Sequence, residues 1–295
     1  MVGREARDTA TNDERGAEEA VTGEDRAAAG ADVFAAVVRL RRERVPGALC
    51  TVVRTAGSTP RRAGAKMVVG SQGLLAGTVG GGRIEKEVVD AAVAALQARA
   101  QPQLLRFHLT HQLAMCCGGE MEIFVEPLLP EPVLVVCGGG HVAQALVPLA
   151  RKVGFCPVLV EDLEELGSPA RFPDAARIID SFAVADWQGI TLGGECYVVV
   201  VTRDHRQDQE LLESLLGYDL AYLGLIGSRR KIAVFQQRLL ARGASPERLA
   251  RVHAPIGLAI GADTPEEIAV AIAAELIQVR AARRGGRGAG GAGGG

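Results

Sequence analysis

The pattern of apolar and polar positions divides the chain into two differently organised halves. In the first half, apolar residues at helical spacing predict a helix over residues 33–44, and Pro46 ends it because proline cannot continue the hydrogen-bond ladder. Short runs rich in β-branched residues follow, separated by turn residues, and they predict a small antiparallel set of strands. A second helical face over residues 84–96 and two further strands complete an α/β domain.

Beyond a proline cluster at residues 127–132, nearly continuous apolar strands alternate with helical stretches. Strands that are buried on both faces lose their polar alternation, so this pattern is typical of a parallel sheet covered by helices. Thr264, Pro265 and Glu267 predict the start of the last helix as its N-cap, first residue and capping-box acid. The predicted fold class is α/β, a small N-terminal α/β domain followed by a Rossmann-like domain with a parallel sheet.

Four segments follow from these patterns. Residues 1–30 are rich in Ala, Gly and charged residues and lack aromatics, so we expect them to be disordered because they cannot bury enough apolar area. Residues 31–129 form the N-terminal domain and residues 130–284 form the Rossmann-like domain. The glycine-rich residues 285–295 are expected to be a flexible tail.

Composition narrows the classes of function. A net charge of -2 gives no electrostatic reason to expect nucleic acid as a partner, because the neutralisation of phosphates needs a clustered basic face and usually a high pI. The apolar runs are far shorter than the roughly 20 residues that span a bilayer, and the N-terminus lacks a signal-peptide core, so we expect a cytoplasmic protein without a membrane partner. Three of the six cysteines, Cys137, Cys156 and Cys196, lie in or beside apolar runs, where free cysteine behaves as a small buried hydrophobe, and this indicates a reducing compartment.

The strongest local signal is the segment CGGGHVA. Gly138, Gly139 and Gly140 follow a predicted strand, His141 opens a predicted helix, and the spacing to Ala143 completes G-x-G-x-x-A. Such glycines let the backbone approach a pyrophosphate, while the helix start supplies free N–H groups. His141 either reaches a ligand phosphate or is solvated, and a glycine turn without a ligand is the alternative for the whole segment.

Charged residues stand at two other predicted strand ends. Glu161 and Asp162 end the second strand of the Rossmann-like half about twenty residues after the glycines, where an acid accepts hydrogen bonds from ribose hydroxyls. Glu161 therefore predicts that the ligand carries a ribose diol rather than a 2′-phosphate. Arg229 and Arg230 lie between a strand and a helix, where they either add positive charge to an anion site or form a solvated basic turn.

A second glycine-rich helix entry lies in the first domain. Gly80, Gly81 and Gly82 either cradle an anion with their backbone N–H groups or allow tight packing.

Cys116 and Cys117 form the single adjacent cysteine pair, and two glycines follow them in a predicted loop. A thiolate beside accessible backbone donors is more reactive than one in a strand, with packed thiols as the alternative. Because adjacent cysteines lack the C-x2-C spacing and no second pair exists, we predict no metal site.

Several separated stretches, in order, resemble the XdhC/CoxI family of molybdenum hydroxylase accessory proteins. They cover about residues 33–280 and read VVRTAGSTPRRAGAKMVV, GTVGGGRIEKEV, CCGGEMEIFVEPL, VCGGGHVAQAL, TRDHRQDQELL, YLGLIGSRRK and HAPIGLAIGADTPEEIAVAIAAEL. The resemblance implies a factor that binds molybdenum cofactor and, with a cysteine desulfurase, supports its sulfuration and insertion into a xanthine dehydrogenase-type hydroxylase. Such a factor is a maturation chaperone rather than a turnover enzyme.

The resemblance also bears on individual residues. Cys117 matches the family's cysteine-glycine-glycine segment, so we expect it near bound cofactor, with Cys116 as the lesser partner. Arg83 replaces a cysteine that some CoxI-type members carry, which favours the XdhC-type branch. Ala259 stands where relatives often have an acid.

Molybdenum cofactor is a phosphate-bearing pterin, molybdopterin, sometimes extended by a nucleotide, so a Rossmann-type site suits it chemically. An NAD(P)-dependent oxidoreductase that uses NAD with the same glycines and Glu161 is one alternative function. A non-catalytic scaffold between hydroxylase and desulfurase is another, and a homodimer is the base-rate expectation for assembly.

Overall fold

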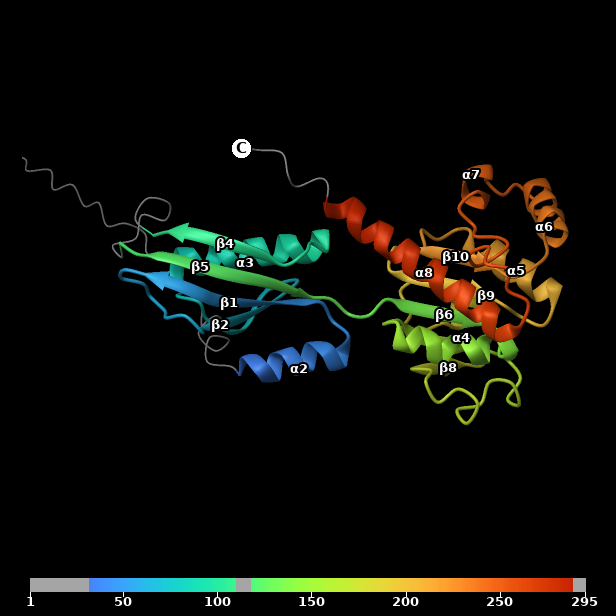
Figure 1. Cartoon of the computed structure of the whole chain (residues 1–295), viewed down its shortest axis with the longest axis horizontal. Helices are drawn as coiled ribbons and strands as arrows, with labels where there is room; N and C mark the ends of the chain where they lie inside the picture. Colours follow the sequence, from blue (N-terminus) through green and yellow to red (C-terminus); the bar gives the residue numbers. More distant parts are fainter. Residues whose placement is uncertain (1–31, 110–117, 289–295) are drawn as a thin grey trace, which may run out of the picture. The chain divides into compact units, whose positions relative to one another are not determined.

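The computed structural model describes residues 32–109 and 118–288, and these form two compact units (Figure 1). Leu128 ends the first unit and Leu129 begins the second, which also includes residues 98–100. Each unit has its own sheet and its own buried core.

The first unit is built on an antiparallel sheet in the order β3-β2-β1-β5-β4, which confirms the predicted antiparallel strands. Its first helix begins because the Asp32 carboxylate accepts hydrogen bonds from the amides of Phe34 and Ala35. The elements in order are α2 (Val33–Glu43), β1 (Gly47–Ala56), β2 (Lys66–Gly70), β3 (Gly73–Gly77), α3 (Gly82–Ala98), β4 (Gln103–His108) and β5 (Glu120–Leu128).

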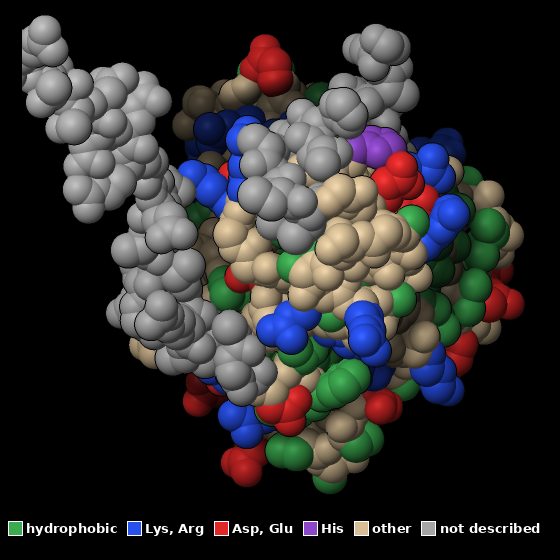
Figure 2. Space-filling model, turned by 90° about the vertical axis from the view of Figure 1, so that its left-hand side faces the viewer, with side chains coloured by type: hydrophobic (Ala, Val, Ile, Leu, Met, Phe, Trp, Pro, Cys, Tyr) green, Lys and Arg blue, Asp and Glu red, His purple; other side chains and the backbone are tan. Residues whose placement is uncertain are grey.

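Helix α2 packs its apolar stripe on the sheet of this unit. Ala36 and Leu40 lie against Val68 of β2 and Ala76 of β3 in one buried cluster. On the same face of the sheet, β4 and β5 carry exposed ion pairs, such as Arg106 and His108 of β4 with acids of β5 at 3.3 and 3.1 Å. Figure 2 shows acidic and basic side chains interspersed on one face of the molecule. The opposite face of β5 is buried, so positions along this strand alternate between buried and more exposed.

The second unit is built on a parallel sheet in the order β10-β9-β6-β7-β8, which confirms the predicted Rossmann-like architecture. Strands and helices alternate along the chain as the apolar runs predict. The elements are β6 (Val133–Cys137), α4 (His141–Lys152), β7 (Cys156–Val160), β8 (Arg177–Ile179), η1 (Val184–Asp186), β9 (Cys196–Val200), α5 (His205–Leu215), β10 (Tyr222–Leu225), α6 (Arg229–Ala241), α7 (Pro246–Leu249) and α8 (Pro265–Gly288).

Helices cover both faces of this parallel sheet. On one face Val135 of β6 packs in a cluster with Leu211 of α5 and with residues of α6. On the other face the next residue, Val136, packs with Leu146 of α4 and Ile272 of α8. Consecutive strand positions are therefore buried on opposite faces, which explains the unbroken apolar runs.

The last helix, α8, has the predicted capping box. The Thr264 hydroxyl accepts from the amide of Glu267 at 3.2 Å, and the Glu267 carboxylate accepts from the amides of Asp263 and Thr264 at 2.9 and 3.1 Å. The helix extends to Gly288, so residues 285–288 are helical where the glycine content predicted a flexible tail. Extending an existing helix adds one hydrogen bond for each residue that is fixed, and this offsets the low helix propensity of glycine.

The remaining terminal predictions concern residues 1–30 and 289–295, which lie outside the described residues. Within the described part of the chain, no helix combines the length and apolar character needed to cross a membrane.

Candidate functional site

The candidate site lies where the order of the parallel strands reverses. After β8 the chain returns to β9 on the other side of β6, so the switch point lies between β6 and β9 at the carboxyl ends of the strands. In doubly wound sheets, ligands bind at this point. Gly138 directly follows β6 with φ +114°, and a Cβ atom built there would lie 2.5 Å from the carbonyl oxygen of Val201. Glycine is therefore required for the two strand ends to approach so closely.

A buried carboxylate holds the glycine turn. The amide of Gly139 donates to Oε2 of Glu161 at 2.7 Å, and the amide of Leu163 donates to Oε1 at 3.2 Å. The Glu161 side chain is 1% exposed, and a Cβ atom on Gly139 would lie 2.5 Å from the carbonyl oxygen of Leu166. Glu161 thus links the end of β7 to the turn after β6.

The start of helix α4 is open to solvent. Gly140 is its N-cap and makes no side-chain capping bond, whereas α5 and α6 are capped by Asp204 and Ser228. A Cβ atom on Gly140 would meet no other atom within 4 Å, and both Gly140 and His141 are exposed. Because no side chain among the described residues caps α4, this helix start presents N–H donors and a positive dipole end to an anion.

An arginine joins two acids beside the turn. The Arg203 guanidinium follows β9, and it pairs with Glu161 and, at 2.7 Å, with Asp162. The hydrogen bond from Arg203 is the largest cause that holds the pKa of Asp162 below its usual range. Arg203 and Asp162 each expose 42% of their side chains. An accessible acid–arginine pair therefore stands at the end of β7, where nucleotide sugars bind in Rossmann-type sheets.

A buried ion pair fixes the helix starts on the other side of the switch point. The Asp208 side chain is fully buried, and Lys231 Nζ lies 2.6 Å from its Oδ2 atom and 3.0 Å from the carbonyl oxygen of Ile226. The Thr202 hydroxyl donates to the other carboxylate oxygen at 2.6 Å. This network ties α5, α6 and the end of β9 together, and it places Arg229 on the exposed first turn of α6.

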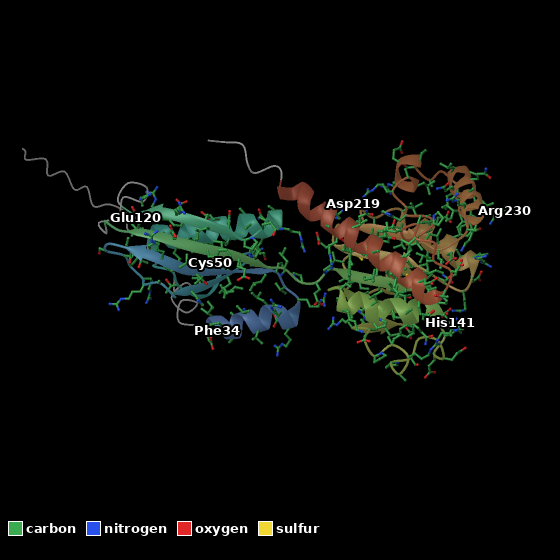
Figure 3. All side chains as sticks on the ribbon, viewed as in Figure 1. Phe34, Cys50, Glu120, His141, Asp219 and Arg230 are labelled. Atoms are coloured by element: carbon green, nitrogen blue, oxygen red, sulfur yellow. The ribbon has the colours of Figure 1, made fainter. Side chains whose placement is uncertain are left out.

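The residues predicted for the Rossmann-like half therefore gather at one edge of the sheet. Figure 3 shows His141 and Arg230 towards this end of the unit, and Asp219 towards the opposite end. His141 follows β6 and Arg229 follows β10, two strands away, which corresponds to about 10 Å across the sheet. The sequence prediction missed Arg203, Asp208 and Lys231, although each stands within a few residues of a predicted strand end or helix start.

The glycine turn of the first unit already has an internal anion. The amides of Val79 and Gly81 donate to Oε2 of Glu85 at 3.1 and 3.2 Å, and the Gly80 amide donates to the Thr78 hydroxyl at 3.1 Å. An external anion at this turn must use other donors or displace Glu85. Anion binding by the three glycines at 80–82 stays a prediction.

Cysteine chemistry is limited among the described residues. Cys50 and Cys196 are buried, and burial raises the pKa of each thiol to about 12. Burial also raises the pKa of Cys137, which directly precedes the glycine turn. Such thiols stay protonated and unreactive. Cys116 and Cys117 lie outside the described residues, so their predicted roles stay predictions.

A doubly wound parallel sheet with a glycine turn at its switch point defines a Rossmann-type domain. A family model described as the XdhC Rossmann domain matches residues 134–276, and the model of the XdhC and CoxI family matches residues 40–108. The chain belongs to the XdhC and CoxI family.

Three relatives illustrate the match. The uncharacterized protein YqeB of Escherichia coli (strain K12) is 34% identical over 255 residues, 84% of this chain and 46% of that protein. A probable xanthine dehydrogenase subunit from Bacillus subtilis (strain 168) is 31% identical over 158 residues, 54% of this chain and 46% of that protein. A crystal structure described as a xanthine dehydrogenase from Bacillus halodurans has a TM-score of 0.48 and 22% identity, with 85% of this chain and 96% of that chain covered. The chain spans less than half the length of the two curated relatives.

Proposed function

We propose that this chain is an accessory factor that binds molybdenum cofactor and supports the maturation of a xanthine dehydrogenase-type hydroxylase. The observation that carries the proposal is the uncapped start of α4 at the switch point of the family's Rossmann domain. The name of the Bacillus subtilis relative, a probable xanthine dehydrogenase subunit, supports the choice of client.

The residues at the carboxyl edge suit the cofactor's polar groups. The open space beside Gly140 and the first amides of α4 accept a phosphate, because helix starts bind anions through free N–H groups. His141, Arg229 and Arg230 add donors and positive charge around this position. When bound, the cofactor supplies the molybdenum centre that a hydroxylase needs. This chain's residues bind it, orient it and limit its contact with water.

The ribose of a nucleotide-extended cofactor is assigned to the end of β7. The prediction that Glu161 accepts hydrogen bonds from the diol stays a prediction, and the oxygens of Glu161 already accept from Gly139, Leu163 and Arg203. Asp162 is the more accessible carboxylate at the same strand end. In this proposal Glu161 orders the turn and Asp162, held by Arg203, meets the sugar.

Sulfuration is the second part of the proposal. The chain works in the cytoplasm with a cysteine desulfurase, and Cys117, assisted less strongly by Cys116, protects or sulfurates the cofactor. Family membership and the chemistry of an accessible thiolate support this role. The proposed protein is a maturation chaperone rather than a turnover enzyme.

Identification of the bound small molecule tests the proposal. The full chain is purified under anaerobic conditions from cells that make molybdenum cofactor, and its ligand is identified by mass spectrometry and metal analysis. A molybdenum-bearing pterin supports the proposal. Bound NAD or NADP favours the oxidoreductase alternative, because the same glycine turn suits a dinucleotide. An empty protein that still binds both hydroxylase and desulfurase favours the scaffold alternative.

A further inference from the structure

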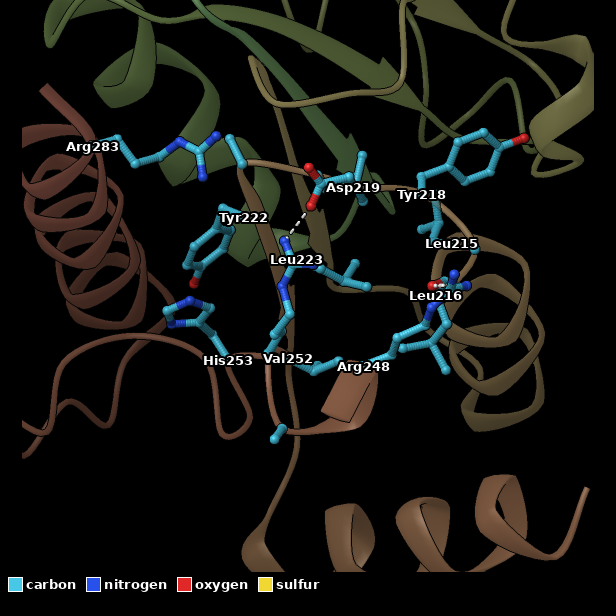
Figure 4. A pocket seen from close by; sticks show the side chains of 15 residues that line it. Leu215, Leu216, Tyr218, Asp219, Tyr222, Leu223, Arg248, Val252, His253 and Arg283 are labelled. Atoms are coloured by element: carbon cyan, nitrogen blue, oxygen red, sulfur yellow. Dashed lines mark hydrogen bonds and ion pairs between the residues drawn. The ribbon is translucent and has the colours of Figure 1, made fainter. Parts of the chain in front are cut away.

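The second unit has a pocket at the amino ends of its strands, on the edge opposite the glycine turn (Figure 4). Its volume is about 370 Å³, within the range of small-molecule sites. The segment that follows α5, the start of β10 and residues 248–253 form most of its wall, and α8 adds Arg283. Strands of four or five residues separate this pocket from the carboxyl edge by roughly 13 Å.

Positive charge dominates the polar side chains of this pocket. Among the described residues, Arg248, Arg251 and Arg283 line it together with a single carboxylate, Asp219. One Asp219 oxygen lies 2.5 Å from the Arg251 guanidinium (Figure 4). The pKa of Asp219 is lowered first by the hydrogen bond from Arg251, and the charge of Arg283 lowers it further. Three guanidinium groups therefore face one carboxylate of the protein itself. The net positive charge that remains can attract an anionic ligand.

Two of the arginines are held in place by backbone oxygens. Arg248 donates to the carbonyl oxygen of Leu216 at 3.0 Å, and Arg283 donates to that of Gly194 at 2.8 Å. Each guanidinium has five N–H donors in a fixed plane, so one anchoring bond leaves further donors for an anion. Anchoring limits the entropy that the side chains lose when a ligand binds.

The floor of the pocket is apolar and buried. Leu215, Leu220 and Leu223 are buried in the core cluster of α5, α6 and the sheet. His253 forms one wall of the pocket. Its ring packs 4.4 Å from the ring of Tyr222, and its Nδ1 atom lies 2.9 Å from Glu275. An apolar floor with a few convergent charged groups is typical of a ligand site.

We propose that this pocket binds a phosphate-type anion, and that Asp219 occupies part of the anion's position in the free protein. The Asp219 side chain is 80% exposed, so it can leave the guanidinium groups without being buried elsewhere. Arginine presents paired donors that match phosphate oxygens. The inference does not depend on the proposed cofactor function, because the pocket and the glycine turn lie at opposite edges of the sheet.

Calorimetric titration of the full chain with inorganic phosphate, pyrophosphate and AMP tests this proposal. Arg251→Gln should weaken binding of the preferred probe by about fivefold to tenfold, because one charged hydrogen-bonding group is lost. Asp219→Asn should strengthen binding, because it removes the competing carboxylate. Tighter binding of AMP than of inorganic phosphate would assign the site to a nucleotide, and the reverse would assign it to a free phosphate.

Two controls separate this pocket from other sites. Arg242→Gln removes an arginine that pairs with Glu213 at 2.9 Å outside the pocket, and it should keep the wild-type affinity. Gly140→Val removes any phosphate bound at the start of α4, so the binding that remains in this variant belongs to the pocket. Equal affinity in wild type, Arg251→Gln and Asp219→Asn would overturn the proposal, as would the absence of binding of all three probes. Loss of binding in Gly140→Val alone would also overturn it, because the phosphate would then occupy the helix start.

Discussion

The amide of Gly139 donates a 2.7 Å hydrogen bond to the carboxylate of Glu161, 22 residues further along the chain. This bond joins the turn after β6 to the end of β7, and the same carboxylate pairs with Arg203 after β9. One buried acid thus organises the ends of three neighbouring strands. The conformation of the glycine turn is fixed by the protein itself, before any ligand binds.

Removal of this acid should destabilise the second unit. Glu161→Ala leaves the Gly139 amide without its acceptor in a buried position, so we expect a loss of about 1–3 kcal/mol in the free energy of unfolding. Glu161→Gln keeps an acceptor oxygen and should lose less. Urea unfolding measures both, and Glu210→Ala, which breaks an exposed pair with Arg206, is the control. Equal effects of Glu161→Ala and Glu210→Ala would show that Glu161 has no organising role.

The buried pair between Asp208 and Lys231 gives a second prediction. Lys231→Met leaves the fully buried Asp208 without its cation, and breaking such a pair costs about 3–5 kcal/mol. Combining Lys231→Met with Asp208→Asn should recover part of this loss, because the uncompensated charge is removed. The free energy of unfolding from urea titration is the measurement. If the Lys231→Met variant has the same free energy of unfolding as the wild type, the pair has no structural role.

We expect the stability of the folded protein at acid pH to depend on the ionisation of Glu275. Burial acts to raise the pKa of Glu275, but hydrogen bonds from His253, Tyr222 and the amide of Gly257 outweigh it and hold the pKa below the usual 4.5. A lowered carboxyl pKa stabilises the folded state above the unfolded pKa, and this contribution is lost as pH falls through the folded pKa. Glu275→Gln should therefore lower the melting temperature near neutral pH and converge with the wild type as the pH falls below 4.5 and through the folded pKa. Melting curves that differ by a constant amount across this range would exclude Glu275 as the titrating group.

A cysteine prediction addresses sulfuration. Cys117→Ser keeps the size and polarity of the side chain while it removes the soft, nucleophilic sulfur. Co-expression with a hydroxylase client should yield less active, undersulfurated client than wild type does, and Cys116→Ser should have a smaller effect. If purified Cys117→Ser binds cofactor normally and its client is fully sulfurated, the thiol is structural and the factor carries and shields the cofactor alone.

Local patterns predicted most of the fold because they reflect burial directly. The apolar run that contains Val135 and Val136 predicted a strand buried on both faces, and the structure buries the two residues in separate cores. The capping box at Thr264 was likewise readable from three neighbouring residues, and the structure confirms it. Buried strands and capping boxes have recurrent sequence patterns, so a single sequence predicts them directly.

The contacts of the candidate site were harder to predict from the sequence, because they join residues that are far apart along the chain. Arg203 meets Glu161 across 42 positions, and Lys231 meets Asp208 across 23. A charged residue after a strand has many candidate partners until the strand order is known. The glycine turn at residues 80–82 was also incompletely predicted, although its partner is close in sequence. The structure shows that the carboxylate of Glu85 accepts hydrogen bonds from backbone amides of this turn.

Cofactor retention by Gly140→Val tests the central claim most directly. Gly140 has φ -72° and open space beyond its Cα atom, so valine fits the fold while its side chain projects towards the proposed phosphate position. Gly193→Val, at another open glycine of the same unit, is the matched control. After anaerobic purification, we expect molybdenum and pterin to accompany wild type and Gly193→Val, and to fall at least about tenfold in folded Gly140→Val. Equal molybdenum content in all three proteins would contradict the assignment of the cofactor to the start of α4.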